Sequence, residues 1–228
     1  MRKAIVLLSG GIDSTVTLAY AISEGYEVYP LTFLYGQKHS REISSAERIV
    51  KHYGLKRHLK INLDPSLFSS SALVSRVIDL PKDRSAEKIG SDIPDTYVPS
   101  RNLVFLSIAS AVGENENVDA IFIGANAIDF SGYPDCRPEF FEAFKKVLEV
   151  GTRRGVRGKP IAIETPILHM KKSEIIKLGK SLNAPLHMTW SCYSGGERAC
   201  GRCDSCVLRL EGFEEAGYED EIEYEARK

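Results

Sequence analysis

Apolar residues in the first part of the chain form short runs that alternate with segments of helical spacing. Residues 3–8 (KAIVLL) are typical of a fully buried strand, and residues 15–21 carry apolar side chains at helical spacing. The alternation continues with a strand at 27–34, a helix at 40–53 and a strand at 57–63. Strands and helices joined by short connections predict right-handed crossovers and a parallel, doubly wound sheet.

A polar interval separates these elements from a second alternating series. Residues 64–100 carry three consecutive serines, several charges and one short apolar patch. We expect the insertion at 64–96 to be either a mobile cover over a site or a tolerated surface insertion. The elements predicted after it are helices at 103–112, 138–151 and 171–182, and strands at 119–124 and 161–165. The predicted fold is α/β, with a doubly wound, mainly parallel five-stranded sheet.

Length and composition limit how this fold is organised. The chain has 228 residues, of which 43% are hydrophobic, enough for a core without disulfide bonds. We expect one domain over residues 1–185, which includes the insertion, and a small helical C-terminal segment over residues 186–228. The sequence contains no internal repeat and no second large domain.

Charge and cysteine usage exclude some classes of function. A formal net charge of −1 argues against a protein that holds nucleic acid mainly through phosphate contacts. No apolar run approaches the roughly 20 residues of a membrane span. The N-terminal run leads directly into a polar turn and is not expected to be a signal peptide. Five cysteines, four of them in one short segment, favour a reducing compartment, and we expect a cytoplasmic protein.

The turn after the first predicted strand is a candidate phosphate site. Residues 9–14 (SGGIDS) supply two glycines, two hydroxyls and one carboxylate between a strand and a helix. Unpaired N–H groups at a helix N-terminus attract anions, and glycine lets the backbone approach a phosphate closely. No lysine follows as in G-x-x-x-x-G-K-[ST], and the adjacent glycines do not fit G-x-G-x-x-G. The alternative is a glycine-rich turn that binds nothing.

Three further polar loops are expected near the carboxyl ends of strands or at a helix entrance. Residues 35–39 (YGQKH) follow the second strand, where α/β proteins place ligand contacts. Arg101 and Asn102 open a helix and either hold an anion or form a solvated cap. Residues 125–137 combine amide, carboxylate, aromatic and guanidinium groups, which suits a flat polar heterocycle, although an ordinary polar turn would look similar. Cys136 in this loop is either a nucleophile or, as is more common, a packing residue.

Four cysteines near the C-terminus have the spacing of a metal site. Cys192, Cys200, Cys203 and Cys206 follow C-x7-C-x2-C-x2-C, and two interlocking C-x-x-C steps favour a closed, structural tetrahedral Zn²⁺ site. We expect one zinc ion per chain. An iron–sulfur cluster uses similar ligands, and redox catalysis by the C-x-x-C pairs is a weaker alternative because no thioredoxin-like context surrounds them.

Taken together, these motifs resemble those of a known enzyme family. The turn at 9–14 alone is similar to the pyrophosphate loop of the PP-loop ATP pyrophosphatases. In chain order, the quoted motifs are 9–14 (SGGIDS), 35–39 (YGQKH), 97–102 (YVPSRN), 124–126 (GAN), 129–137 (DFSGYPDCR) and 189–193 (TWSCY). With the cysteine segment they resemble the 7-cyano-7-deazaguanine synthase family of queuosine biosynthesis, called QueC. Lys38 stands where the family has arginine at least as often, and residues 64–93 match no motif of it.

The resemblance implies an adenine nucleotide alpha hydrolase-like fold and an ATP-dependent ligase that forms carbon–nitrogen bonds. Such an enzyme converts 7-carboxy-7-deazaguanine and ammonia to 7-cyano-7-deazaguanine through an adenylated carboxylate and then an activated amide. It also implies Mg²⁺ with ATP, free ammonia as the nitrogen source, a homodimer, and neither a membrane nor a stable nucleic-acid partner.

Roles for individual residues follow from the same resemblance. The expected ATP-binding residues are Leu8, Ser9, Gly10, Gly11, Ile12, Asp13, Ser14 and Thr15. The expected substrate-binding residues are Gln37, His39, Arg101, Asn102, Asn126, Asp129, Tyr133, Asp135 and Arg137. The expected catalytic residues are Asp13, Arg101 and Lys171, with Lys172 as the alternative lysine. No general base is evident from the sequence.

Two other classes of function are compatible with parts of the sequence. One is a PP-loop enzyme that modifies tRNA, and the other is a zinc-ribbon nucleic-acid-binding module that uses ATP only as a regulator. The near-neutral charge weighs against the first of them, and the glycine-rich turn together with the loop suited to a heterocycle favours an enzyme that acts on a small molecule.

Overall fold

A computed structural model describes residues 1–37, 41–75, 77–83, 93–128 and 132–226 of the chain. Its centre is a five-stranded sheet in the order β3-β2-β1-β4-β5, in which every pair of neighbouring strands is parallel. The strands are β1 (Lys3–Leu7), β2 (Glu27–Leu34), β3 (Leu59–Asn62), β4 (Ala120–Phe122) and β5 (Ala162–Glu164). The chain leaves β1 toward β2 on one side and later returns to β4 on the other. A ligand-binding crevice is expected where the strand order reverses in this way.

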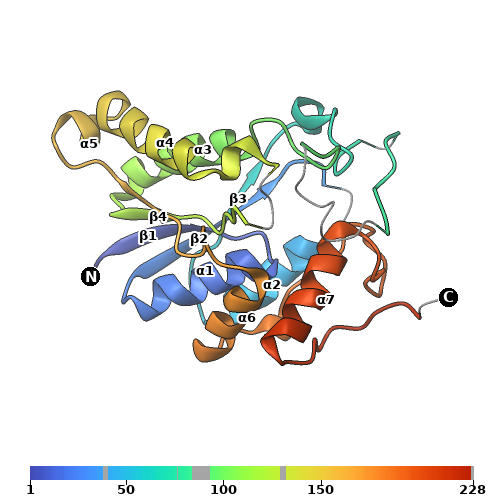
Figure 1. Cartoon of the computed structure of the whole chain (residues 1–228). Helices are drawn as coiled ribbons and strands as arrows, with labels where there is room; N and C mark the ends of the chain where they lie inside the picture. Colours follow the sequence, from blue (N-terminus) through green and yellow to red (C-terminus); the bar gives the residue numbers. More distant parts are fainter. Residues whose placement is uncertain (38–40, 76, 84–92, 129–131, 227–228) are drawn as a thin grey trace.

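Helices cover both faces of the sheet (Figure 1). The helices are α1 (Ile12–Ser23), α2 (Arg41–His52), α3 (Arg101–Glu116), α4 (Pro138–Gly151), α5 (Arg153–Val156), α6 (Lys172–Ser181) and α7 (Asp204–Ala216). In the view of Figure 1, α3, α4 and α5 lie above the sheet, and α1, α2, α6 and α7 lie below it. The predicted α/β, doubly wound architecture is therefore confirmed, and the sheet is parallel throughout the described residues.

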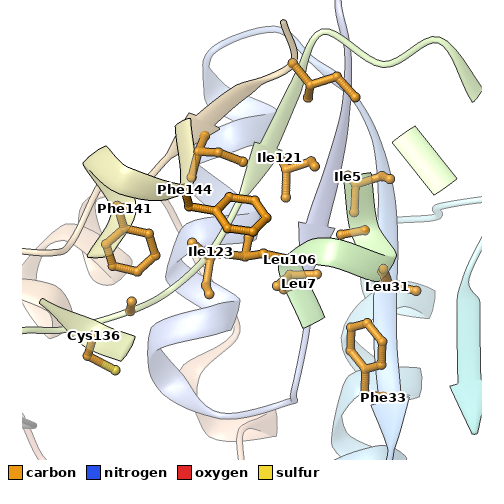
Figure 2. Packing of buried hydrophobic residues seen from close by; sticks show 14 of the residues in the cluster. Ile5, Leu7, Leu31, Phe33, Leu106, Ile121, Ile123, Cys136, Phe141 and Phe144 are labelled. Carbon is orange, nitrogen blue, oxygen red and sulfur yellow. The ribbon is translucent and has the colours of Figure 1, made fainter. Parts of the chain in front are cut away.

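The central strands divide their side chains between two hydrophobic clusters. Ile5 and Leu7 pack toward α3 and α4, together with Phe141 and Phe144 (Figure 2), whereas Ala4 and Val6 pack on the opposite face with α1 and α2. Strands covered on both faces are expected to read as continuous apolar runs, and residues 3–8 do so because of this double burial. The core thus fixes the carboxyl ends of β1, β2 and β4 side by side.

The described part of the insertion at 64–96 contacts the cysteine segment. Residues 65–68 form a 3₁₀ turn (Pro65–Phe68), and Lys82 forms an isolated antiparallel bridge with Cys203. The Asp83 carboxylate accepts hydrogen bonds from the Arg202 guanidinium, one of them 2.8 Å long. These contacts join two segments that the sequence gives no reason to pair. The proposed mobility of the insertion stays a prediction.

Element bounds differ from the predicted ones mainly at the ends. Helix α3 is longer than the predicted 103–112, since it begins at Arg101 and continues to Glu116. Strands β4 and β5 are three residues each, shorter than their apolar runs. Over the described residues, no helix combines the length and hydropathy needed to cross a membrane.

Candidate active site

A cavity opens at the carboxyl ends of β1, β2 and β4. It is lined by the turn after β1, the end of β2, the first turns of α2, α3 and α6, the loop after β4, and residues of the C-terminal segment. The C-terminal contributors are Trp190, Ser191, Tyr193, Ser205, Leu208 and Arg209. Segments from both ends of the chain therefore form one site. The predicted division into residues 1–185 and 186–228 stays a prediction, and the cavity spans both parts.

The hydroxyl groups of Ser9 and Ser14 form hydrogen bonds within the turn after β1. The Ser14 hydroxyl donates to the Gly11 carbonyl over 3.1 Å and accepts from the Ser9 N–H over 3.2 Å, and the Gly11 N–H donates to Ser9 Oγ over 3.3 Å. Of the eight residues predicted to bind ATP, six line the cavity: Leu8, Ser9, Gly11, Ile12, Asp13 and Ser14. Gly10 and the buried Thr15 do not line it. Thr15 instead donates its hydroxyl to the Gly11 carbonyl over 2.7 Å.

A lysine from α6 meets the carboxylate in this turn. Lys172 Nζ lies 2.6 Å and 2.8 Å from the two carboxylate oxygens of Asp13, and both residues line the cavity. Lys171, the lysine predicted to be catalytic, is exposed outside the cavity, and its backbone N–H is bonded to Glu174 at the start of α6. The structure therefore brings Lys172, the alternative lysine, to the turn after β1 that is predicted to bind phosphate.

The Lys172 side chain passes over a glycine of α7. A Cβ atom built on Gly212 would lie 2.3 Å from Lys172 Cγ and 2.9 Å from Lys172 Cβ. Real Cβ atoms do not approach other carbon atoms so closely. The absence of a side chain at Gly212 is thus what lets Lys172 reach Asp13.

Arg101 and Glu42 are two oppositely charged residues that line the cavity. Burial lowers the pKa of Arg101, but nearby Tyr35, Cys136, Tyr133 and Asp135 outweigh that effect and its pKa lies above the usual value. Burial raises the pKa of Glu42 to about 7, opposed by Arg101 and reinforced by Cys192. Both residues line the cavity, so a cation and a carboxyl group that titrates near neutrality share one wall of it.

Several residues predicted to bind substrate instead support the cavity wall. The buried Asp135 accepts a hydrogen bond from the Asn102 N–H over 2.9 Å, and the Asn102 side chain donates to the Asp135 carbonyl over 2.9 Å. Asn102 also donates to Cys136 Sγ over 3.3 Å. Burial raises the pKa of Cys136 to about 12, which argues against a nucleophilic thiolate. Asn102 and Cys136 line the cavity, but Asp135 does not.

The remaining residues predicted to bind substrate differ in where they lie relative to the cavity. Tyr133, Asn126 and Gln37 line the cavity, and Asn126 also donates to the Met170 carbonyl while accepting from the Ile128 N–H over 2.9 Å. Arg137 is exposed at the start of α4 and lies outside the cavity lining. His39 and Asp129 lie outside the described residues.

Sequence reasoning missed several cavity residues. Glu42 follows the polar turn after β2 by only a few positions, and an acidic residue in the first turn of a helix is ordinary enough to pass unnoticed. Trp190 and Tyr193 belong to the TWSCY motif, which was noted for the resemblance but given no role. Leu208 and Arg209 lie on α7, which no periodic pattern announced.

The four C-terminal cysteines converge as a metal site requires. Cys192, Cys200, Cys203 and Cys206 are all buried, and their sulfur atoms lie within 4.8 Å of one another. Tetrahedral Zn–S bonds of about 2.3 Å place sulfurs roughly 3.8 Å apart, so the group fits such an ion. Backbone N–H groups of Ser194 and Cys200 also point at Cys192 Sγ, at 3.4 Å and 3.3 Å. Four thiolates with no open position suit a structural ion.

Comparisons of the sequence with known proteins show the family of this chain. A family model described as "Queuosine biosynthesis protein QueC" matches residues 3–217. The chain belongs to this family. A QueC relative from Acetivibrio thermocellus, named 7-cyano-7-deazaguanine synthase, is 54% identical over 227 residues and covers 100% of both chains. Relatives with the same name from Thermoplasma acidophilum (54% identity, 98% of this chain and 92% of the relative) and Nostoc sp. (48%, 97% of each) are similar over nearly their whole lengths.

Solved structures support the fold of this QueC chain. An NMN synthetase from Francisella tularensis has a TM-score of 0.51 at 16% identity, covering 96% of this chain and 78% of that one. At this level of identity the likeness speaks for the fold alone.

Proposed function

We propose that this protein is a 7-cyano-7-deazaguanine synthase, which uses ATP to convert 7-carboxy-7-deazaguanine and ammonia to the nitrile. The observation that carries the proposal is the cavity in which the SGGIDS turn, the Asp13–Lys172 pair and Arg101 face a wall suited to a heterocycle. Membership of the QueC family and the names of its relatives support the same reaction.

The chemistry needs two activations. A carboxylate is a poor electrophile, and transfer of a nucleotide group to its oxygen supplies a leaving group that ammonia displaces. The resulting amide is still less reactive, and a second activation at its oxygen allows that oxygen to leave as the nitrile forms. One site that binds ATP beside the substrate can act in both rounds.

The cavity suggests how its residues divide this work. The hydroxyl and N–H groups of the turn at 9–14 would bind the nucleotide phosphates, and Lys172 would balance their charge. Arg101 would bind the substrate carboxylate and stabilise the oxyanion that forms when ammonia adds to the activated carbon. Tyr133, Asn126 and Gln37 would contact the deazaguanine, and His39 and Asp129 stay predictions for the same role.

Two metal ions are part of the proposal. Mg²⁺ would neutralise phosphate charge, and oxygen atoms of the nucleotide would be its main ligands, because both Asp13 carboxylate oxygens are already bonded to Lys172. Zn²⁺ at the four cysteines would fix the C-terminal segment against the cavity rather than act on substrate.

Three finer features are proposed on the resemblance to the family. They are free ammonia as the nitrogen source, assembly as a homodimer, and a cytoplasmic location.

A mass-resolved turnover assay tests the reaction. Purified protein is incubated with Mg·ATP, ammonium and 7-carboxy-7-deazaguanine, and we expect ammonium-dependent formation of the nitrile. Asp13→Ala removes the partner of Lys172 from the phosphate-binding turn and should lower turnover about 100-fold or more. Accumulation of the amide alone would contradict the second activation. Absence of any product from folded, zinc-loaded protein would contradict the proposed function.

A further inference from the structure

Glu42 is fixed beside the phosphate-binding turn by close backbone packing. It lies in the first turn of α2 and lines the cavity. Gly10, with a φ of +94°, packs against the Glu42 carbonyl so closely that a Cβ on Gly10 would lie 2.2 Å from that oxygen. Only glycine fits there, since the left-handed φ and the contact both exclude a side chain. The position of Glu42 is therefore tied to that of the nucleotide-binding turn.

The Glu42 carboxyl faces the substrate side of the cavity. Its electrostatic neighbours come from three elements: Arg101 of α3, Tyr35 at the end of β2, and Tyr193 and Cys192 of the C-terminal segment. Within the described part of the chain, its carboxylate oxygens have no hydrogen-bond donor. Burial raises the pKa of Glu42 and Arg101 opposes that rise, and the carboxyl group lines the cavity, where it can exchange a proton with a bound substrate.

The proposed reaction releases protons from nitrogen. When NH₃ adds to the activated carboxyl carbon, the C–N bond forms, and the amide appears once nitrogen has lost one proton and the nucleotide has left with the C–O bonding electrons. In the second round, the oxygen-activated amide loses its two N–H protons as the second C–O bond breaks and the nitrile forms. Three protons leave one nitrogen atom, and Asp13, the carboxylate of the turn at 9–14, is bonded through both of its oxygens to Lys172.

We propose that Glu42 is the base that accepts protons from the reacting nitrogen in both rounds. The proposal rests on the proposed function and assigns the general base that the sequence did not reveal. Glu42 lies between the nucleotide-binding turn, through Gly10, and the substrate-binding wall, through Arg101. If the nucleotide binds at the turn and the heterocycle binds beside Arg101, the carboxyl carbon that reacts with ammonia lies between the two, next to Glu42.

A trapping experiment separates proton removal from activation of the carboxylate. Hydroxylamine is largely unprotonated at neutral pH and traps an activated carboxyl group as a hydroxamate. Because hydroxylamine is a much weaker base than ammonia, its adduct is far more acidic and loses one N–H proton to water without a protein base. In Glu42→Gln, we expect hydroxamate formation within about threefold of the native rate and amide formation from ammonium lowered about 100-fold or more. Glu42→Asp keeps the carboxylate but shortens its reach, and should show an intermediate loss of amide formation. The aspartate variant also carries the test if the glutamine variant does not fold.

Glu47→Gln is the matched control. Glu47 lies on the same helix, is exposed, and forms an ion pair with Lys60 away from the cavity. It should leave both products unchanged. Amide formation near the native rate in both Glu42 variants, or equal loss of hydroxamate and amide in the folded variants, would overturn the assignment. Native protein that forms neither product would instead contradict the proposed function.

Discussion

Lys172 and Asp13 are 159 positions apart in the sequence and meet at the phosphate-binding turn. Their ion pair is largely buried, with side-chain exposures of 11% and 19%. Lys172→Ala should lower turnover about 100-fold, because it removes the cation proposed to balance the phosphate charge and leaves the Asp13 carboxylate without its lysine partner. Lys171→Ala is the comparison, and its exposed side chain predicts a loss of less than about threefold. Steady-state kinetics on both variants decides which lysine takes part in turnover. A larger loss in Lys171→Ala than in Lys172→Ala would show that Lys171 is the catalytic lysine.

A second prediction at this scale concerns Gly212. Gly212→Ala would place a methyl group where Lys172 Cγ lies, and should displace the lysine from Asp13. We expect turnover to fall about 10- to 100-fold, since small misplacements in an active site have costs of this size. Gly151→Ala, where the nearest atom to the new Cβ lies 4.0 Å away, should leave turnover unchanged. Equal turnover of the two alanine variants would show that Lys172 accommodates the methyl group.

At the scale of elements, one hydrogen-bonded link joins three neighbouring strands. The Thr32 hydroxyl of β2 donates to the Leu8 carbonyl after β1 over 2.7 Å, and accepts from His58 Nε2, just before β3, over 2.8 Å. Burial, and then Lys60, lower the pKa of His58 below its usual value. Protonated His58 therefore favours the unfolded chain.

This link predicts a pH dependence of stability. The stabilisation by neutral His58 is fully present above the unfolded-state pKa of about 6.5 and is lost as the pH falls toward the lower folded-state value. In the native protein, the urea concentration at the unfolding midpoint should decrease as the pH is lowered from 7.5 to 5.5. The fall should be smaller in His58→Gln, which keeps a donor to Thr32 but cannot titrate. Identical pH profiles would contradict the role of His58.

The positions of the strands could be predicted, whereas within the C-terminal segment expected to be helical the bounds of α7 could not, for reasons of packing. Strands β1 and β2 are covered on both faces, and this double burial leaves an apolar run in the sequence. Helix α7 distributes its side chains among a metal-site cysteine, the cavity and the α6 interface, so Cys206, Leu208 and Phe213 serve three different surroundings. No single apolar stripe results, and periodicity has nothing to detect.

At the scale of the whole molecule, the site depends on which distant segments converge. The motifs gave the phosphate-binding turn, Arg101 and the four cysteines, because each carries its chemistry in a local pattern. The sequence did not give Glu42 or Arg209 as cavity residues, since their roles arise from tertiary contacts alone. The same limit explains Asp135 and Arg137, whose loop follows a strand end as expected while their side chains lie outside the cavity lining.

Metal removal tests how far the C-terminal segment supports the cavity. Trp190, the only tryptophan in the sequence, lines the cavity, donates its indole N–H to the Cys192 carbonyl over 3.1 Å, and bonds through its backbone N–H to the Gly10 carbonyl over 2.9 Å. Chelation should therefore shift its fluorescence emission to the red and abolish turnover together. Cys136→Ala should keep one zinc per chain, because Cys136 lies outside the sulfur cluster. Full turnover of zinc-free protein supplied with Mg·ATP, after the chelator has been removed, would contradict a supporting role.

The bond between Gly10 and Trp190 also has a consequence for how the protein is made. Synthesis proceeds from the N-terminus, so the turn proposed to bind ATP leaves the ribosome long before Trp190, Ser205 and Arg209, which line the same cavity, have been made. A partly synthesised or C-terminally degraded chain would have the turn without its far wall. We therefore expect nucleotide consumption to require the complete polypeptide, so that a fragment without the C-terminal segment would hydrolyse no ATP.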